Sequence, residues 1–201
     1  MTVPASGWAR RLVVPLAAFL FGLVTLGLAA MLTLGGRTEQ LGASGIGGPL
    51  TLVSHEGRSV TERDFLGAPF LVFFGFTHCP EICPTKLFEI SEVLRAAGEK
   101  GGKLKALFIT VDPERDTPEV LKSYLASFDE RIMGLTGPQE AVDQTVRAYK
   151  AFARKVPTKG GDYTMDHTAL VYRMDSKGRF VGSFNLARPP SEAARDLLRG
   201  P

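Results

Sequence analysis

The stretch FLVFFGFTHCPEICPT, residues 70–85, leads from a continuous apolar run into the only two cysteines of the chain, Cys79 and Cys83. An apolar run without polar alternation is typical of a strand that is buried on both faces. After Cys83, apolar side chains recur at helical spacing from Leu87 to Ala97. The cysteines are therefore predicted to lie where a buried strand passes into a helix, near its unpaired N–H groups and positive dipole end. A thiol placed there is expected to have a depressed pKa, which indicates thiol redox chemistry or soft-metal binding.

Composition sets broad limits on the rest of the chain. The 201 residues are 44% hydrophobic and 22% charged, which is an ordinary globular balance and is sufficient for one domain with a core plus an N-terminal appendage. The formal net charge is +3, and removing the contribution of Arg10 and Arg11 near the N-terminus leaves about +1. Such a small excess gives no indication of a nucleic-acid-binding surface.

The N-terminal part of the sequence predicts a membrane anchor. Residues 12–34 carry no charge, and at ~1.5 Å per residue they would extend over ~34 Å as a helix, enough to cross the hydrocarbon core of a bilayer. Arg10 and Arg11 precede this segment, so the positive-inside rule places residues 1–11 in the cytoplasm and the rest of the chain beyond the membrane. The alternative is a cleaved signal peptide, but the apolar regions of signal peptides usually extend over only ~7–15 residues.

The remaining sequence divides into a tether and one domain. Residues 35–49 are rich in Gly, Ser and Ala and are predicted to be flexible, and residues 50–201 are predicted to form the domain. Within the domain, apolar runs alternate with stretches of helical periodicity. The expected strands are residues 50–53, 70–76, 104–111, 132–135, 168–174 and 180–184, and the expected helices are residues 84–97, 117–128, 138–152 and 191–199.

This order of elements predicts an α/β fold. Alternating strands and helices imply parallel pairing, and the hairpin of residues 168–184 adds antiparallel strands, so the central sheet is expected to be mixed. Helices on both faces of such a sheet, with two cysteines at a strand–helix junction, are typical of the thioredoxin-like fold. Fold class by itself does not determine function.

The spacing of the cysteines leaves both chemistries open. Cys79 and Cys83 are separated by three residues, whereas thioredoxin-type redox motifs have two. If the helix reaches back to Cys79, the i,i+4 spacing places both sulfurs on one face, where they can form a disulfide or bind one metal ion. A purely structural disulfide is a further reading, although so short a loop would constrain the unfolded chain little. Two thiolates are too few for a structural zinc site, whereas thiolates suit Cu(I) and imidazole suits Cu(II).

A copper site of that kind needs a histidine, and the chain has three. His55 lies in a polar turn and is predicted to be solvated, and the side chain of His78 is expected to diverge from that of its neighbour Cys79. His167 precedes the apolar run of residues 168–174. In thioredoxin-like folds the loop before that strand faces the cysteines and normally carries a cis-proline, but residues 158–188 contain no proline. His167 is therefore the predicted third ligand, with a structural role as the alternative, and Met165 is a weaker candidate.

Three motifs now point to a family. Residues 73–85 closely resemble the signature of the Sco/SenC family, residues 111–118 resemble its second motif, and residues 166–168 resemble its third. The resemblance covers residues 50–198, and three motifs in the same order are far more specific than a cysteine pair. It implies a thioredoxin-like domain anchored to the cell inner membrane and facing the periplasm. It also implies copper binding, as Cu(I) or Cu(II), by Cys79, Cys83 and His167.

The resemblance further implies a function and partners. The expected function is that of a copper metallochaperone rather than an enzyme, which assists assembly of the binuclear copper (CuA) centre of cytochrome c oxidase. The expected partners are the copper-site subunit of the oxidase, a periplasmic copper donor and a thiol reductant. The alternative is a thiol–disulfide oxidoreductase in which Cys79 and Cys83 reduce the cysteines of the oxidase copper site. A thiol peroxidase fits poorly, because the close pair would form a disulfide with itself.

Asp112 and Asp116 follow the strand that is expected to lie beside the cysteine-bearing strand. Two readings of these residues stay open. In the first, the carboxylates tune the charge of the site or dock a copper donor. In the second, they stabilise the turn and the N-terminal cap of the next helix, a cap for which Thr117 is the other candidate.

Overall fold

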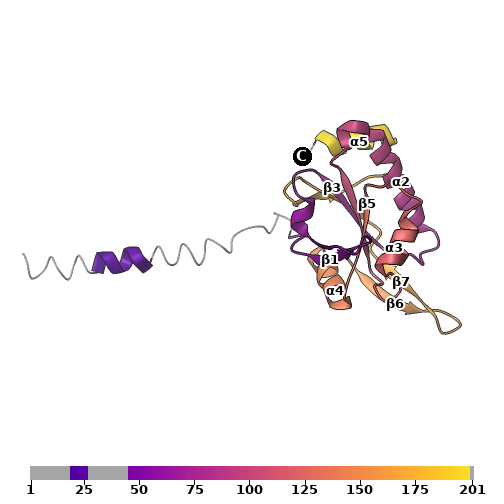
Figure 1. The fold of residues 1–201 in the computed structure, drawn as a ribbon, viewed down its shortest axis with the longest axis horizontal. Coiled ribbons are helices and arrows are strands. Elements are labelled where there is room, and N and C mark those ends of the chain that lie inside the picture. Colours follow the sequence, from indigo (N-terminus) through magenta and orange to yellow (C-terminus); the bar gives the residue numbers. More distant parts are fainter. Residues whose placement is uncertain (1–18, 27–44, 200–201) are drawn as a thin grey trace, which may run out of the picture. The chain divides into compact units, whose positions relative to one another are not determined.

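The computed structural model describes residues 19–26 and 45–199 of the chain (Figure 1). The chain separates into two units, Met1–Gln40 and Leu41–Pro201. In the first unit, residues 19–26 are helical. Across the two described ranges, no helix combines the length and the apolar character needed to cross a bilayer. Most of the predicted anchor, residues 12–18 and 27–34, lies outside the described residues, and the anchor stays a prediction.

A seven-stranded mixed sheet forms the centre of the second unit, with the strand order β2-β1-β5-β4-β3-β8-β9. Strands β3, β4 and β5 pair in parallel, and the other pairings, β2–β1, β1–β5, β3–β8 and β8–β9, are antiparallel. The mixed sheet predicted from the order of elements is thereby confirmed. The strands are β1 (Thr51–Ser54), β2 (Ser59–Thr61), β3 (Phe70–Gly75), β4 (Lys105–Thr110), β5 (Ile132–Thr136), β8 (Val171–Met174) and β9 (Phe180–Ser183).

Helices cover both faces of this sheet. Figure 1 shows α2 and α3 along one side of the sheet and α4 along the other, and α5 packs against α2. The α-helices of this unit are α2 (Ile82–Ala97), α3 (Pro118–Leu125), α4 (Gln139–Ala148) and α5 (Pro190–Arg199), and the 3₁₀ turns are η2 (Glu62–Phe65) and η3 (Gly98–Gly101).

Strand β3 is buried along its whole length, and its side chains alternate between two apolar layers. On the side of α2 and α3, the ring of Phe73 lies 6.0 Å from that of Phe108. On the opposite side, the ring of Phe74 makes edge contacts with Tyr149, which follows α4, and with Tyr172 on β8. Because both faces are covered by apolar groups, the strand requires a continuous apolar run, as its sequence indicated.

The segment after α4 differs from the prediction. The expected helix 138–152 ends at Ala148, and Lys150 takes a left-handed φ of 52°. The N–H of Ala151 donates to the carbonyl oxygen of Val146, which closes the helix as a left-handed C-terminal cap does. Residues after this cap form β6 (Ala153–Pro157), which pairs with β7 (Tyr163–His167) in a separate two-stranded sheet. The predicted strand 168–174 correspondingly begins only at Val171, and His167 ends β7 instead.

Candidate metal centre

The two cysteines lie at the junction that the sequence predicted, but with unequal exposure. Helix α2 begins at Ile82, so Cys79 precedes the helix and is partly exposed, whereas Cys83 lies in the first turn and is fully buried. Pro84 is the third residue of the helix and not the first, a position whose N–H also has no intrahelical partner. The backbone N–H of Cys83 donates to Sγ of Cys79 at 3.3 Å. Both thiols are free.

The sulfur of Cys79 thus occupies the place of a helix cap. Glu81, the N-cap residue, makes no capping hydrogen bond with its own side chain. Sγ of Cys79 accepts one of the first four N–H groups of α2 in its stead, at the end of the helix where the dipole favours negative charge. This contact keeps Sγ of Cys79 beside the backbone of Cys83.

The expectation of a depressed pKa is wrong for Cys83. Burial raises the pKa of the Cys83 thiol well above its ordinary value, because the charged thiolate would lose its hydration. The hydrogen bond between the thiols of Cys79 and Cys83 adds to this rise in the pKa of Cys83. Proximity to the start of a helix therefore does not by itself make a thiol acidic when the sulfur is excluded from water.

Gly75, at the end of β3, makes room for the buried sulfur. A Cβ atom at this position would lie 2.8 Å from Sγ of Cys83 and 2.6 Å from Cε2 of Phe108. Only a glycine therefore lets Cys83 pack against the strand. This role was not predicted from the sequence, although a glycine inside an otherwise apolar strand often marks such a close approach.

His167 ends β7 with its ring among aromatic side chains. The ring makes edge contacts with the rings of Phe73 and Phe76, with centroid-to-centroid distances of 6.3 Å and 5.8 Å. Nδ1 lies 3.1 Å from the carbonyl oxygen of Thr168, which can only accept, so Nδ1 carries the hydrogen and Nε2 keeps its lone pair. Nε2 lies 3.7 Å from Sγ of Cys83. Burial lowers the pKa of His167, which favours the neutral imidazole that metals bind.

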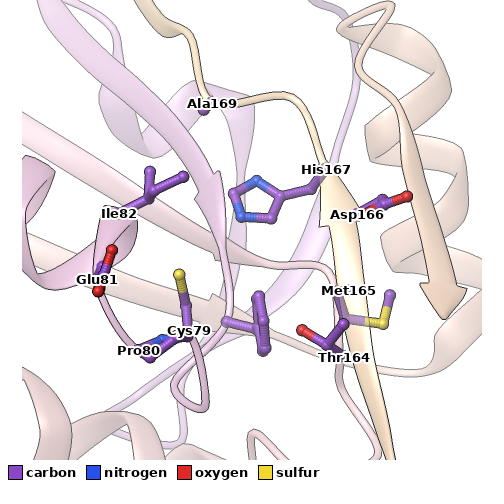
Figure 2. A pocket seen from close by; sticks show the side chains of 10 residues that line it. Cys79, Pro80, Glu81, Ile82, Thr164, Met165, Asp166, His167 and Ala169 are labelled. Carbon is purple, nitrogen blue, oxygen red and sulfur yellow. The ribbon is translucent and has the colours of Figure 1, made fainter. Parts of the chain in front are cut away.

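Cys79, Cys83 and His167 therefore form one group. Their ligand atoms all lie within 4.8 Å of one another. Cys79 and His167 line opposite sides of a pocket of about 280 Å³, which gives solvent access to the group (Figure 2). Two soft thiolates and one neutral imidazole suit copper, and they fall one ligand short of a closed tetrahedral zinc site. Met165 also lines the pocket, but Figure 2 shows its side chain directed away from Cys79.

The other two histidines lie outside this group, as expected. His78 is exposed and contacts the hydroxyl of Thr77 through Nδ1. His55 is partly buried rather than fully solvated, because its Nδ1 accepts the backbone N–H of Gly134 at 3.0 Å. Its role in the described structure is to join the end of β1 to β5.

Asp116 holds the segment that leads to Cys79. Its buried carboxylate accepts the backbone N–H of Thr77 at 3.1 Å and the hydroxyls of Thr77 and Thr110, each at 2.6 Å. Burial raises the pKa of the Asp116 carboxyl in spite of these bonds. The cap of α3 is instead Thr117, whose hydroxyl accepts from the N–H of Val120.

Asp112 holds the segment that leads to His167. Its buried carboxylate is paired with Arg115 and accepts the hydroxyl of Tyr163, on β7, at 2.9 Å. Neither Asp112 nor Asp116 is on the surface, so neither side chain is placed to dock a partner. Both carboxylates have a structural role, which agrees in part with the turn-and-cap reading. Their hydrogen bonds, however, reach residues that are distant in the sequence and not only those of a local turn.

A thioredoxin-like α/β domain with two thiols and an imidazole gathered at one edge of its sheet defines a class of thioredoxin-fold proteins equipped to bind a soft metal ion. The family model described as SCO1/SenC matches residues 38–199. The chain belongs to the SCO1/SenC family.

Individual relatives agree with this assignment. The chain is 38% identical over 164 residues to the mitochondrial Protein SCO1 homolog of Mus musculus, a match that covers 80% of this chain and 58% of that protein. The chain thus spans little more than half the length of the curated relatives it matches. It is 56% identical to Bradyrhizobium japonicum ScoI with copper bound, with a TM-score of 0.75 over 78% of this chain and 99% of that one. Yeast Sco1 with copper bound is 35% identical, with a TM-score of 0.69 over 77% and 87% of the two chains.

We predict that Gly75→Ala displaces the sulfur of Cys83. The new methyl group overlaps Sγ of Cys83 and the ring of Phe108, so the free energy of unfolding should fall by about 1–3 kcal/mol. Alkylation of Cys83 in the folded protein should become faster. Urea unfolding and timed alkylation with mass spectrometry measure both effects. Gly137→Ala is the matched control, because its Cβ meets its nearest neighbour at 3.4 Å. Equal behaviour of the two variants would contradict the assigned role of Gly75.

We predict that His167 makes the metal-free, reduced protein less stable in acid. Burial holds the pKa of His167 below its ordinary value of 6.5, so the unfolded chain binds this proton first as the pH falls. The free energy of unfolding should therefore decrease as the pH falls through 6.5, and His167→Gln should show a smaller decrease than the wild type.

Urea unfolding at pH 7.5 and pH 5.5 provides the measurement. His78→Gln is the control, because this exposed histidine should leave the wild-type decrease in place. If His167→Gln and His78→Gln lose the same free energy of unfolding between the two pH values, His167 is not the cause of the decrease in acid.

Proposed function

We propose that this chain is a copper metallochaperone that binds copper through Cys79, Cys83 and His167 and assists assembly of the CuA centre of cytochrome c oxidase. One observation carries the proposal: the two sulfurs and the imidazole nitrogen lie within 4.8 Å of one another beside an open pocket. The copper-bound form of ScoI from Bradyrhizobium japonicum, at 56% identity, supports copper as the ion. The oxidase as target follows from the motifs shared with the Sco/SenC family.

The two oxidation states of copper would use different numbers of these three ligands. Two thiolates satisfy Cu(I), and an added imidazole favours Cu(II). The hydrogen on Nδ1 of His167 leaves Nε2 free to bind, and the same nitrogen already lies beside Sγ of Cys83. Copper is here the cargo, and the exposed side of the site, formed by Cys79 and His167, is where a recipient protein would reach it.

The second candidate is a thiol–disulfide oxidoreductase, which the unequal burial of the two sulfurs favours. Cys79 is accessible and would attack a disulfide of the target, which forms a mixed disulfide and releases one thiol of the target. Buried Cys83 would then displace the second thiol and close a Cys79–Cys83 disulfide, so the target gains two electrons. In this function His167 is not needed as a ligand.

The proposed setting is the periplasmic side of the cell inner membrane. Residues 12–34 would anchor the chain, with residues 1–11 in the cytoplasm, residues 35–49 as a tether and residues 50–201 outside. An oxidising compartment favours the disulfide over the dithiol, and disulfide and metal compete for the same sulfurs. We therefore propose a thiol reductant and a copper donor as partners, besides the copper-site subunit of the oxidase.

The two functions predict opposite outcomes for copper transfer. The full-length chain, loaded or metal-free, is mixed with the copper-site domain of cytochrome c oxidase in its reduced or oxidised form. We expect the loaded chain to deliver copper to the reduced target, and His167→Ala to lower the affinity for Cu(II) by about tenfold or more, since even indirect changes at metal sites cost about 10–100-fold. The copper spectrum of the target follows transfer, and thiol trapping follows reduction.

The control for this experiment is His78→Ala, which removes an exposed imidazole outside the group. Rapid reduction of the oxidised target by the metal-free chain, together with no copper delivery by the loaded chain, would overturn the chaperone and establish the reductase.

The proposed anchor predicts how the chain fractionates. The full-length chain should stay with the membranes through an alkaline wash, because residues 12–34 would lie in the hydrocarbon core, and deletion of residues 1–40 should release it. N-terminal sequencing should find the segment before residue 12 retained. A soluble product that begins near Met31 would instead show a cleaved signal peptide.

A further inference from the structure

The ligand His167 is carried by a hairpin that does not belong to the main sheet. Strands β6 and β7 pair only with each other among the described strands, from Ala153 opposite His167 to Pro157 opposite Tyr163. A single two-stranded hairpin is at best marginally stable in water. The position of His167 relative to the cysteines therefore depends on what the hairpin contacts beyond its own two strands.

Arg115, in the loop after β4, makes several of these contacts. The guanidinium of Arg115 lies 3.8 Å from the centroid of the Tyr163 ring, a cation–π contact. Nη1 of Arg115 also donates to the carbonyl oxygen of Tyr163 at 3.1 Å and to Asp162 at 3.4 Å. The hydroxyl of Tyr163 donates to Asp112 at 2.9 Å, so ring, backbone and hydroxyl of one residue are all held.

A second set of contacts joins the same loop to β6. Nζ of Lys155, on β6, lies 4.7 Å from the ring centroid of Tyr163 and donates to Glu114 at 2.6 Å. The guanidinium of Arg115 is paired with Asp112 as well, which fixes its plane. The loop of residues 111–117 thus contacts both strands of the hairpin, β7 through Tyr163 and β6 through Lys155.

The same loop reaches the rest of the metal centre. Arg115 lies 6.0 Å from the ring centroid of Phe76, and the ring of Phe76 makes the 5.8 Å edge contact with His167. Asp116, the next residue, holds Thr77 at the start of the segment that carries Cys79. One loop therefore connects the segment of the thiols to the segment of the imidazole.

We propose that Arg115 and Tyr163 form a latch that positions His167 against the two thiols, and that this latch determines the affinity for Cu(II) while leaving the affinity for Cu(I) almost unchanged. The inference rests on the proposed ligand set. Cu(I) is satisfied by Cys79 and Cys83, which the segment before α2 and its first turn carry without the hairpin. Cu(II) needs the imidazole, and opening of the latch removes that nitrogen from the sulfurs. Arg115 and Tyr163 are positioning residues and are not ligands.

Two pairs of variants in the full-length chain test the latch. Tyr163→Ala and Arg115→Ala should each lower the affinity for Cu(II) about 10- to 100-fold, as loss of indirect support commonly does at metal sites, and should weaken the thiolate-to-Cu(II) charge-transfer band. Tyr163→Phe should lose less than Tyr163→Ala, because the ring under Arg115 stays. Arg115→Lys should lose more than Tyr163→Phe, because an ammonium cannot reproduce the planar stack and paired hydrogen bonds of a guanidinium. The affinity for Cu(I), measured by competition, should stay within about threefold.

A metal-free readout separates the latch from copper binding itself. Amide hydrogen exchange in β6 and β7 should become faster in Tyr163→Ala and Arg115→Ala, while amides of β3 keep their protection. Arg154→Ala is the matched control, because Arg154 pairs with Asp166 across the same hairpin without reaching the loop of residues 111–117. It should change neither the exchange of the hairpin nor the Cu(II) affinity.

The latch and the ligand set can fail separately. Unchanged exchange and unchanged Cu(II) affinity in Tyr163→Ala would overturn the latch, and so would an equal loss of Cu(I) and Cu(II) affinity. His167→Ala tests the proposed ligand set separately. If that variant binds Cu(II) as the wild type does, the ligand set is wrong, whereas the exchange measurement still reports whether Arg115 and Tyr163 hold the hairpin.

Discussion

The parallel pairing of β3 with β4 is the constraint on which the metal centre depends. Parallel strands end at the same edge of a sheet, so the segment after β3, which carries Cys79, emerges beside the loop after β4. Asp116 of that loop can therefore accept both the N–H and the hydroxyl of Thr77. The continuous apolar run of β3 requires cover on both faces, which suits a strand inside the sheet, between β4 and β8. The position of the thiols thus follows from the burial of a strand that has no chemistry of its own.

The parts of the site that the sequence predicted are those governed by local patterns. The apolar run and the helical spacing after it placed Cys79 and Cys83 at a strand–helix junction, and the absence of proline near His167 indicated that this histidine faces the thiols. The β6–β7 hairpin was missed, because Ala153–Pro157 follows a helix that closes at Lys150 without the usual glycine. The space below Gly75 and the effect of burial on Cys83 were also missed, since both depend on side chains distant in the sequence.

The unequal burial of the two sulfurs bears on both candidate functions. Water is excluded from Cys83, and burial raises its thiol pKa, so its thiolate needs a positive partner to form readily. A bound copper ion supplies that charge directly, and the neutral imidazole of His167 adds a third donor without adding negative charge. A reductase gains from the exposure of Cys79, but the raised pKa of Cys83 opposes the second displacement, which needs a thiolate. The electrostatics of the buried sulfur therefore agree better with a metal ligand than with a thiol that works alone.

The buried carboxylates Asp112 and Asp116 explain why the loop between β4 and α3 is built as it is. A buried charge is costly unless it is paired or receives several hydrogen bonds, and each carboxylate meets that condition by reaching a different segment. Asp116 is satisfied by Thr77 and Thr110, and Asp112 by Arg115 and Tyr163. Asp116 therefore needs the thiol segment in place and Asp112 needs the histidine hairpin in place, so the full set of bonds to the loop requires both segments. The loop thereby couples the segment of Cys79 and Cys83 to the hairpin of His167, so an ion bound by all three residues would also stabilise the contacts that hold them.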